Sequence, residues 1–141
     1  MLKVVLDANI FISAMITAKG NPAKIIDLIR VQEIELVLSL SILEEIKRVL
    51  LYPHLQKIHK RGQNTMDDLN EIAAVATFTK DTSPPLDIIK NDPSDNKYLA
   101  CAMEGGADFI ISGDNHLLDL KNFHGIEIVK PEVFLYRLTL I

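Results

Sequence analysis

The chain opens with Val4-Val5-Leu6-Asp7, a short apolar run that contains two β-branched residues and ends at an acid. Such a run predicts a strand that is buried on both faces, as in a parallel sheet. Similar runs follow at residues 34–39, 108–112 and 126–129. Helical patterns separate them, at residues 10–16, 22–29, 42–51, 65–78 and 92–104, and another helix is expected from Pro131. This alternation predicts an α/β sandwich with a mainly parallel sheet.

The length and composition fit one ordinary globular domain, expected to span residues 1–141. Hydrophobic residues make up 48% and charged residues 24%, which excludes disordered and collagen-like classes. The single cysteine excludes an internal disulfide framework and a multi-cysteine metal site. The sequence shows no secretory signal and no uncharged apolar stretch of about 18 residues, so we expect a cytoplasmic protein that does not associate with membranes.

Two acids stand where strands are expected to end. Asp7 closes the first strand, and Asp114 lies two residues after the strand that ends at Ser112. In parallel α/β sheets, ligands bind outside the carboxyl ends of the strands, so both acids are candidates for function. Each acid taken alone also fits a turn or a helix N-cap.

A third acid, Asp95, is expected on the apolar face of a helix. Tyr98, Leu99 and Ala102 follow it at helical spacing, which places the acid on the side that faces the core. Lone acids are rarely buried unless they are paired or bind a metal. Asp92 precedes a proline and fits a helix N-cap, although a supporting role at a metal site stays open.

Two adjacent acids, Glu44 and Glu45, can be separated by their angle on the helix expected over residues 42–51. Measured from the centre of its apolar stripe, Glu45 lies at about 100° and Glu44 at about 160°. Glu45 therefore flanks the buried face and can reach a cleft, unless it is simply an exposed helix acid. Glu44 is expected to be solvated, or to complete a capping box with Ser41 at the N-cap.

Together these acids predict a cluster of carboxylates at one edge of the sheet. Such a cluster is unfavourable when empty, because like charges repel and raise one another's pKa. A hard divalent cation relieves the repulsion, and ligands that are all oxygen favour Mg²⁺ or Mn²⁺. Metal-assisted phosphoryl transfer is the chemistry that needs a site of this kind.

The acids occur in an order that resembles the PIN-domain family of ribonucleases. Four motifs carry the resemblance, at residues 4–13, 41–46, 92–100 and 108–118, and they contain Asp7, Glu45, Asp95 and Asp114 in turn. The match spans nearly the whole chain and is nearest the VapC-like, toxin-component branch. Two departures are Ala8, where the family often has Thr, and Asp119, a nearby acid whose role stays open.

The resemblance implies a three-layer α/β/α sandwich and endonucleolytic hydrolysis of RNA. It implies that Mg²⁺ or Mn²⁺ is bound by Asp7, Glu45, Asp95 and Asp114, while Asn9 and Ser112 order water or neighbouring oxygens. It also implies a small antitoxin protein as partner, and a homodimer.

The charge balance taken alone disfavours nucleic acid as a partner, because the chain has 15 Lys and Arg residues and 19 Asp and Glu residues, which give a net charge of −4. Basic residues nevertheless cluster at positions 47–61, as candidate RNA contacts or as an ordinary solvated surface. They are Lys47, Arg48, His54, Lys57, His59, Lys60 and Arg61. The four histidines lack metal-binding spacing and are expected in surface or packing roles. The apolar terminal helix either forms a dimer or antitoxin surface or packs on the sheet.

Other classes fit less well. A catalytically inactive PIN-like module that docks RNA or a protein remains the main alternative. A phosphatase of the haloacid-dehalogenase type would need a second Asp where Asn9 stands. Response-regulator receivers need paired acids by the first strand and a late strand-end Lys, which are not evident, and glycine-rich nucleotide loops are absent.

Overall fold

A mixed, mostly parallel sheet forms the centre of the computed structural model, which describes residues 1–17, 19–52, 65–80 and 95–140. The strand order is β3-β2-β1-β4-β6-β5. The strands are β1 (Lys3–Leu6), β2 (Glu35–Leu38), β3 (Thr77–Phe78), β4 (Phe109–Ile111), β5 (Asn122–Phe123) and β6 (Ile126–Val129). The pairs are parallel except for β5 with β6. The predicted parallel α/β sheet is thereby confirmed.

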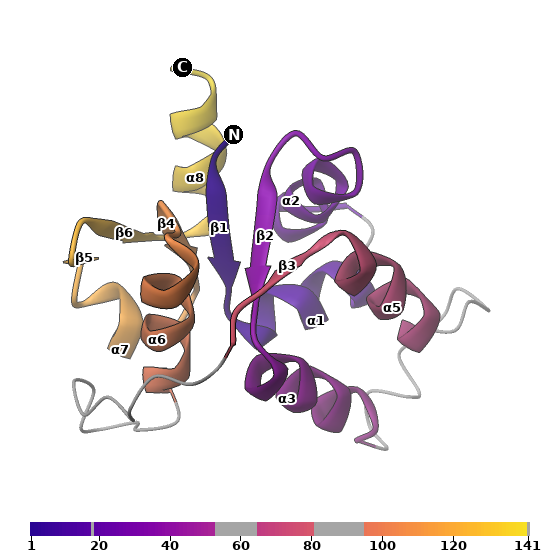
Figure 1. Cartoon of the computed structure of the whole chain (residues 1–141). Helices are drawn as coiled ribbons and strands as arrows, with labels where there is room; N and C mark the ends of the chain where they lie inside the picture. Colours follow the sequence, from indigo (N-terminus) through magenta and orange to yellow (C-terminus); the bar gives the residue numbers. More distant parts are fainter. Residues whose placement is uncertain (18, 53–64, 81–94, 141) are drawn as a thin grey trace.

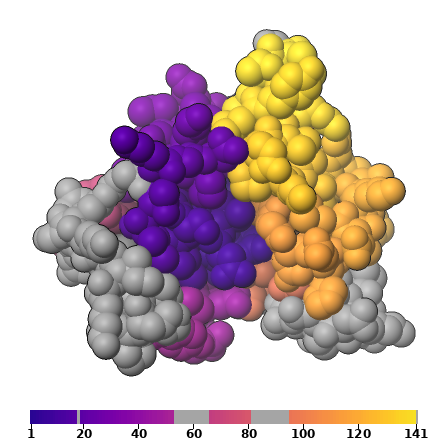
Figure 2. All heavy atoms as spheres, turned by 180° about the vertical axis from the view of Figure 1, so that it is seen from behind, coloured from indigo at the N-terminus to yellow at the C-terminus, as the bar shows by residue number. Residues whose placement is uncertain are grey.

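Helices flank the sheet and complete a three-layer α/β/α arrangement (Figure 1). They are α1 (Ala8–Ile16), α2 (Asn21–Arg30), α3 (Leu40–Leu50), α5 (Thr65–Val75), α6 (Asn96–Gly105), α7 (Asn115–Leu118) and α8 (Pro131–Leu138). α6 packs on β1, β2 and β4, whereas α1 and α2 pack on each other behind the sheet. In Figure 2 the yellow C-terminal helix lies beside the indigo and purple N-terminal segments, in agreement with the contact between α2 and α8. No helix in the described ranges is long and apolar enough to cross a membrane.

The core consists of the strand side chains and one face of each large helix. The run that opens the chain is completely enclosed, since Val4, Val5 and Leu6 are at most 1% exposed. On α3 the predicted stripe is confirmed, with Ile42 and Ile46 fully buried. Burying apolar surface is the main favourable contribution to folding, so these faces hold the strand ends in place.

Two local expectations were wrong. The helix expected to reach residue 78 ends at Val75, and Thr77–Phe78 instead pairs with β2 as a short edge strand. The N-cap of α3 is Ser39 rather than Ser41, because Ser39 has extended backbone angles and its Oγ accepts a hydrogen bond from the Ile42 N–H at 3.3 Å. With Ser39 at the cap, Glu44 is too far along the helix to complete a capping box.

Candidate metal centre

Asp7 connects the end of β1 to the start of α1. Its Oδ1 accepts a hydrogen bond from the Asn9 backbone N–H at 2.6 Å, which makes Asp7 the N-cap of α1. Its Oδ2 accepts a hydrogen bond from the Ser112 hydroxyl, also at 2.6 Å. The residue is only 4% exposed. Both carboxylate oxygens are therefore fixed in direction, while the Asn9 side chain itself is exposed.

Ser112 links Asp7 to Asp114 across two neighbouring strands. Parallel pairing sets Leu6 opposite Ile111, so the residues that follow, Asp7 and Ser112, come side by side. Ser112 is completely buried, and its Oγ accepts a hydrogen bond from the Asp114 N–H at 2.9 Å. Asp114 is in turn the N-cap of α7. The strand ends expected to carry the site are thus joined through one hydroxyl.

Asp95 and Asp114 form a group with a histidine that the sequence did not single out. Ligand atoms of Asp95, Asp114 and His116 all lie within 4.8 Å of one another, and such a group could hold a metal ion. Asp95 immediately precedes α6 and is buried, as its predicted core-facing position requires. His116 is exposed on the first turn of α7, where its N–H bonds Asp114 Oδ1 at 2.8 Å.

Glu45 lies on α3 and is held by two neighbours on α6. The Tyr98 hydroxyl donates a hydrogen bond to Glu45 Oε2 at 2.8 Å, and the Lys97 Nζ lies 2.5 Å from the same oxygen. The Tyr98 oxygen also accepts a hydrogen bond from the Ala8 N–H at 3.1 Å, beside Asp7. Glu44 is exposed and Glu45 is half-buried, in agreement with the angular estimate.

The electrostatic environment is unfavourable for negative charge. Burial raises the pKa of Asp7, and repulsion from Asp114 and Glu45 raises it further. Hydrogen bonds from Ser112 and the Asn9 N–H lower it in part, but the net direction is upward. Burial, followed by the contact with Glu45, raises the pKa of the Tyr98 phenol well above its usual range, so Tyr98 stays a hydrogen-bond donor.

The donor set fits a divalent cation. Asp95 and Asp114 offer oxygens and His116 a nitrogen within a small volume, and the buried carboxylate of Asp7 is tied to Asp114 through Ser112. A bound cation would relieve the repulsion that acts on Asp7.

Other candidate residues are placed less fully. Lys47 and Arg48 lie on the last turn of α3, and Arg48 is exposed. Asp119 is the C-cap of α7 and is exposed. The remaining candidates lie outside the described residues; these are Asp92, His54, Lys57, His59, Lys60 and Arg61.

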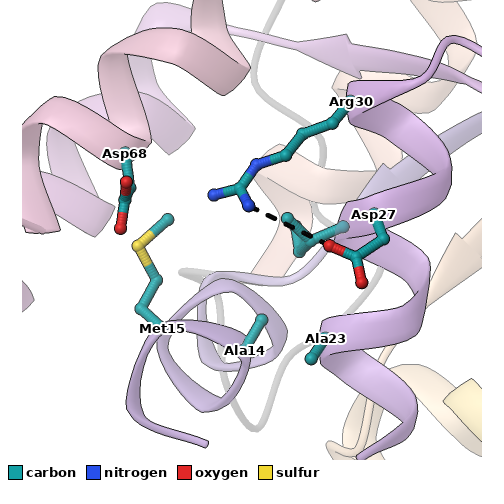
Figure 3. A pocket seen from close by; sticks show the side chains of 7 residues that line it. Ala14, Met15, Ala23, Asp27, Arg30 and Asp68 are labelled. Carbon is teal, nitrogen blue, oxygen red and sulfur yellow. Dashed lines mark ion pairs between the residues drawn. The ribbon is translucent and has the colours of Figure 1, made fainter. Parts of the chain in front are cut away.

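A separate cavity of about 140 Å³ lies between α1, α2 and α5 (Figure 3). Its polar lining consists of Arg30, Asp27 and Asp68, and Arg30 pairs with Asp27 at 3.9 Å. Neither Asp7 nor Asp114 lines this cavity. It is therefore distinct from the carboxylate group at the strand ends.

The fold and the group of acids define an α/β protein with a carboxylate-rich centre at the carboxyl edge of its sheet. The sequence profile of the PIN domain matches residues 3–116, and the chain belongs to the PIN-domain family. Membership of this family indicates nuclease activity and supports the PIN interpretation over the phosphatase and receiver alternatives.

Two known proteins are similar to this chain. The uncharacterized protein MJ1680 from Methanocaldococcus jannaschii is 36% identical over 122 residues, which cover 86% of this chain and 76% of that protein. The crystal structure of PAE2754 from Pyrobaculum aerophilum matches with a TM-score of 0.59 at 18% identity, over all of this chain and 91% of that chain. At this identity, the structural match shows a shared fold.

Proposed function

We propose that this protein is a metal-dependent endoribonuclease that uses Mg²⁺ or Mn²⁺ to hydrolyse RNA. The proposed ligands are Asp7, Glu45, Asp95 and Asp114. The observation that carries the proposal is the connection from Asp7 through Ser112 to Asp114, beside the group that contains Asp95. Three segments far apart in the sequence thus bring acids to one edge of the sheet, where family membership also leads one to expect a nuclease site.

In the proposed reaction, the oxygen of water adds to phosphorus, one P–O ester bond breaks, and the leaving oxygen takes up a proton. A bound divalent cation would supply Lewis-acid polarisation of the phosphate and a lowered pKa for water. The side chains of the protein fix the geometry. Ser112 and the Asn9 N–H aim the two oxygens of Asp7, and Tyr98 holds one oxygen of Glu45. Asp92, three residues before Asp95 in the sequence and outside the described residues, is proposed to support this centre.

RNA is proposed to lie along basic residues near the end of α3. Lys47 and Arg48 would contact phosphates there. Lys57, Lys60 and Arg61 are proposed as further phosphate contacts, and they lie outside the described residues. Phosphate contacts of this kind provide affinity that falls with salt, and they do not depend on a positive charge for the whole molecule.

The proposed biological setting is a toxin–antitoxin pair in which a small protein holds the nuclease inactive. Exposed apolar side chains near the C-terminus support a protein partner or a homodimer, because Tyr136 on α8 is 63% exposed and Leu140, just after α8, is 65% exposed. The inner side of α8 is used for packing, since Phe134 is fully buried and stacks edge-on with Phe109 at 5.3 Å.

A catalytically inactive, PIN-like module that binds RNA or a protein is the second candidate. The observation that favours it is the contact between Lys97 and Glu45, because an ammonium group already neutralises this carboxylate. Calorimetric titration separates the two candidates. Binding of Mg²⁺ or Mn²⁺ supports the nuclease, and a protein that binds neither ion supports the inactive module.

Cleavage of RNA in the presence of Mn²⁺, and its loss with EDTA, tests the nuclease directly. We expect Asp7→Asn and Asp95→Asn to abolish cleavage. Glu44→Gln is the control variant, because Glu44 is the exposed neighbour of Glu45 on α3. Undiminished cleavage by the Asp7 and Asp95 variants would contradict the assignment.

A further inference from the structure

We propose that His116 is a nitrogen ligand of the metal centre and that it biases the centre toward first-row transition ions over Mg²⁺. The inference rests on the proposed function, because it concerns the same centre. It goes further in naming a ligand that the sequence pattern did not indicate and the ion class that this ligand selects.

The position of His116 is the first argument. Its ligand atom shares a volume with oxygens of Asp95 and Asp114, with all separations within 4.8 Å. Metal–ligand bonds of about 2.1 Å allow two ligand atoms of one ion to lie up to about 4.2 Å apart, so this group is close to the size that one ion spans.

The way in which His116 is held is the second argument. Its backbone N–H bonds Asp114 Oδ1 at 2.8 Å, and its Nδ1 lies 3.7 Å from the same oxygen. The position of Asp114 is fixed because its backbone N–H donates a hydrogen bond to the hydroxyl of the buried Ser112. The imidazole of His116 therefore lies beside the proposed ligand Asp114. Asp114 is also the N-cap of α7, the helix that carries His116.

The chemistry of the imidazole gives the selectivity. Mg²⁺ prefers oxygen donors and gives up its water reluctantly, whereas imidazole nitrogen suits first-row transition ions. Replacing one oxygen donor by a nitrogen therefore lowers the affinity of the centre for Mg²⁺ relative to its affinity for those ions. Mn²⁺ is the useful probe, because it is paramagnetic and accepts both oxygen and nitrogen ligands.

Electron paramagnetic resonance with Mn²⁺ tests the inference in the intact protein. We expect pulsed spectra of wild type to show coupling to one histidine ¹⁴N, and His116→Gln to lose it. The affinity for Mn²⁺ should fall by about 10-fold or more in this variant, on the scale of known changes around metal ligands. The affinity for Mg²⁺, measured by competition, should stay close to that of wild type.

His124→Gln is the matched control. His124 is also exposed, but it stacks against Phe123 at 4.4 Å in the turn before β6 and belongs to a different part of the fold. We expect this variant to keep both the ¹⁴N coupling and the affinity for Mn²⁺.

The outcomes separate the inference from the proposed function. Bound Mn²⁺ without ¹⁴N coupling would overturn the role of His116 and leave the carboxylate centre standing. Equal losses of Mn²⁺ and Mg²⁺ affinity in His116→Gln would overturn the selectivity. If wild type binds neither ion, both the inference and the proposed nuclease fail.

Discussion

The Ser112 hydroxyl donates a hydrogen bond to Asp7 Oδ2 at 2.6 Å, between residues 105 positions apart in the sequence. The Ser112 Oγ in turn accepts a hydrogen bond from the Asp114 N–H at 2.9 Å. Ser112 thus uses its donor and one acceptor position to set the spacing between two proposed metal ligands. A small buried hydroxyl can do this because its proton rotates to suit its neighbours.

Replacing Ser112 by alanine should disturb both folding and metal binding. The variant leaves a buried carboxylate oxygen of Asp7 without its donor, which costs about 1–3 kcal/mol. Metal affinity should also fall, because ligands without supporting hydrogen bonds typically bind about 10–100-fold more weakly. Urea unfolding and Mn²⁺ titration measure the two effects. Ser13→Ala, at an exposed position on α1, is the control, and an unchanged Mn²⁺ affinity in Ser112→Ala would contradict the prediction.

Asp7→Asn should stabilise the metal-free protein at neutral pH. Burial raises the pKa of Asp7 above its ordinary value of 3.8, so ionised Asp7 opposes folding. The protonated form of Asp7 contributes stability in full when the pH is below 3.8. This stabilisation is lost as the pH rises through the pKa that Asp7 has in the folded protein. Asparagine avoids this loss and keeps an oxygen for the cap of α1.

Thermal unfolding across pH checks this prediction. The melting temperature of metal-free Asp7→Asn should exceed that of wild type at pH 7, and the difference should shrink toward pH 4. Added Mn²⁺ should raise the melting temperature of wild type more than that of the variant, because stabilisation follows ligand affinity. If metal-free Asp7→Asn has a lower melting temperature than wild type at pH 7, then the charge of Asp7 does not destabilise the folded protein.

Tyr98→Phe should destabilise the fold by about 1–3 kcal/mol, because the Ala8 N–H loses its acceptor in a buried setting. It should also weaken RNA cleavage, since Glu45 loses one of the two groups on α6 that hold its Oε2. Chemical unfolding and cleavage assays measure these effects. Tyr136→Phe is the matched control, because Tyr136 is 63% exposed. Equal stability of the two variants would argue against the bridging role of Tyr98.

Gly105→Ala should destabilise the protein even though alanine favours helices. A Cβ on Gly105 would overlap with Val37 Cγ1 and lie 3.3 Å from Thr79 Cγ2, where α6 meets β2. Overpacking of this kind costs about 1–3 kcal/mol, against about 1 kcal/mol gained in helix propensity.

Chemical unfolding of two glycine variants decides this point. Gly113→Ala is the control, because a Cβ there meets nothing within 4 Å. We expect the control to unfold near wild type, and Gly105→Ala to recover stability when Val37→Ala is added. If Gly105→Ala unfolds at the same denaturant concentration as wild type, then β2 moves to accept the added Cβ without a loss of stability.

The sequence by itself determined the parallel sheet and the positions of the acids along it. Apolar runs such as Val4-Val5-Leu6 can only be buried, and an acid after such a run must emerge at the end of the strand. Helical angles likewise separated the half-buried Glu45 from the exposed Glu44. These features are local, because they depend on periodicity within one element.

The tertiary structure alone decided which side chains meet. Pairing of β1 with β4 brings Ser112 to Asp7, and packing of α6 beside α3 brings Lys97 and Tyr98 to Glu45. His116 joined the carboxylates although its spacing matched no metal motif. Periodicity shows which face of an element is buried, but strand order and register determine the neighbour that the face meets.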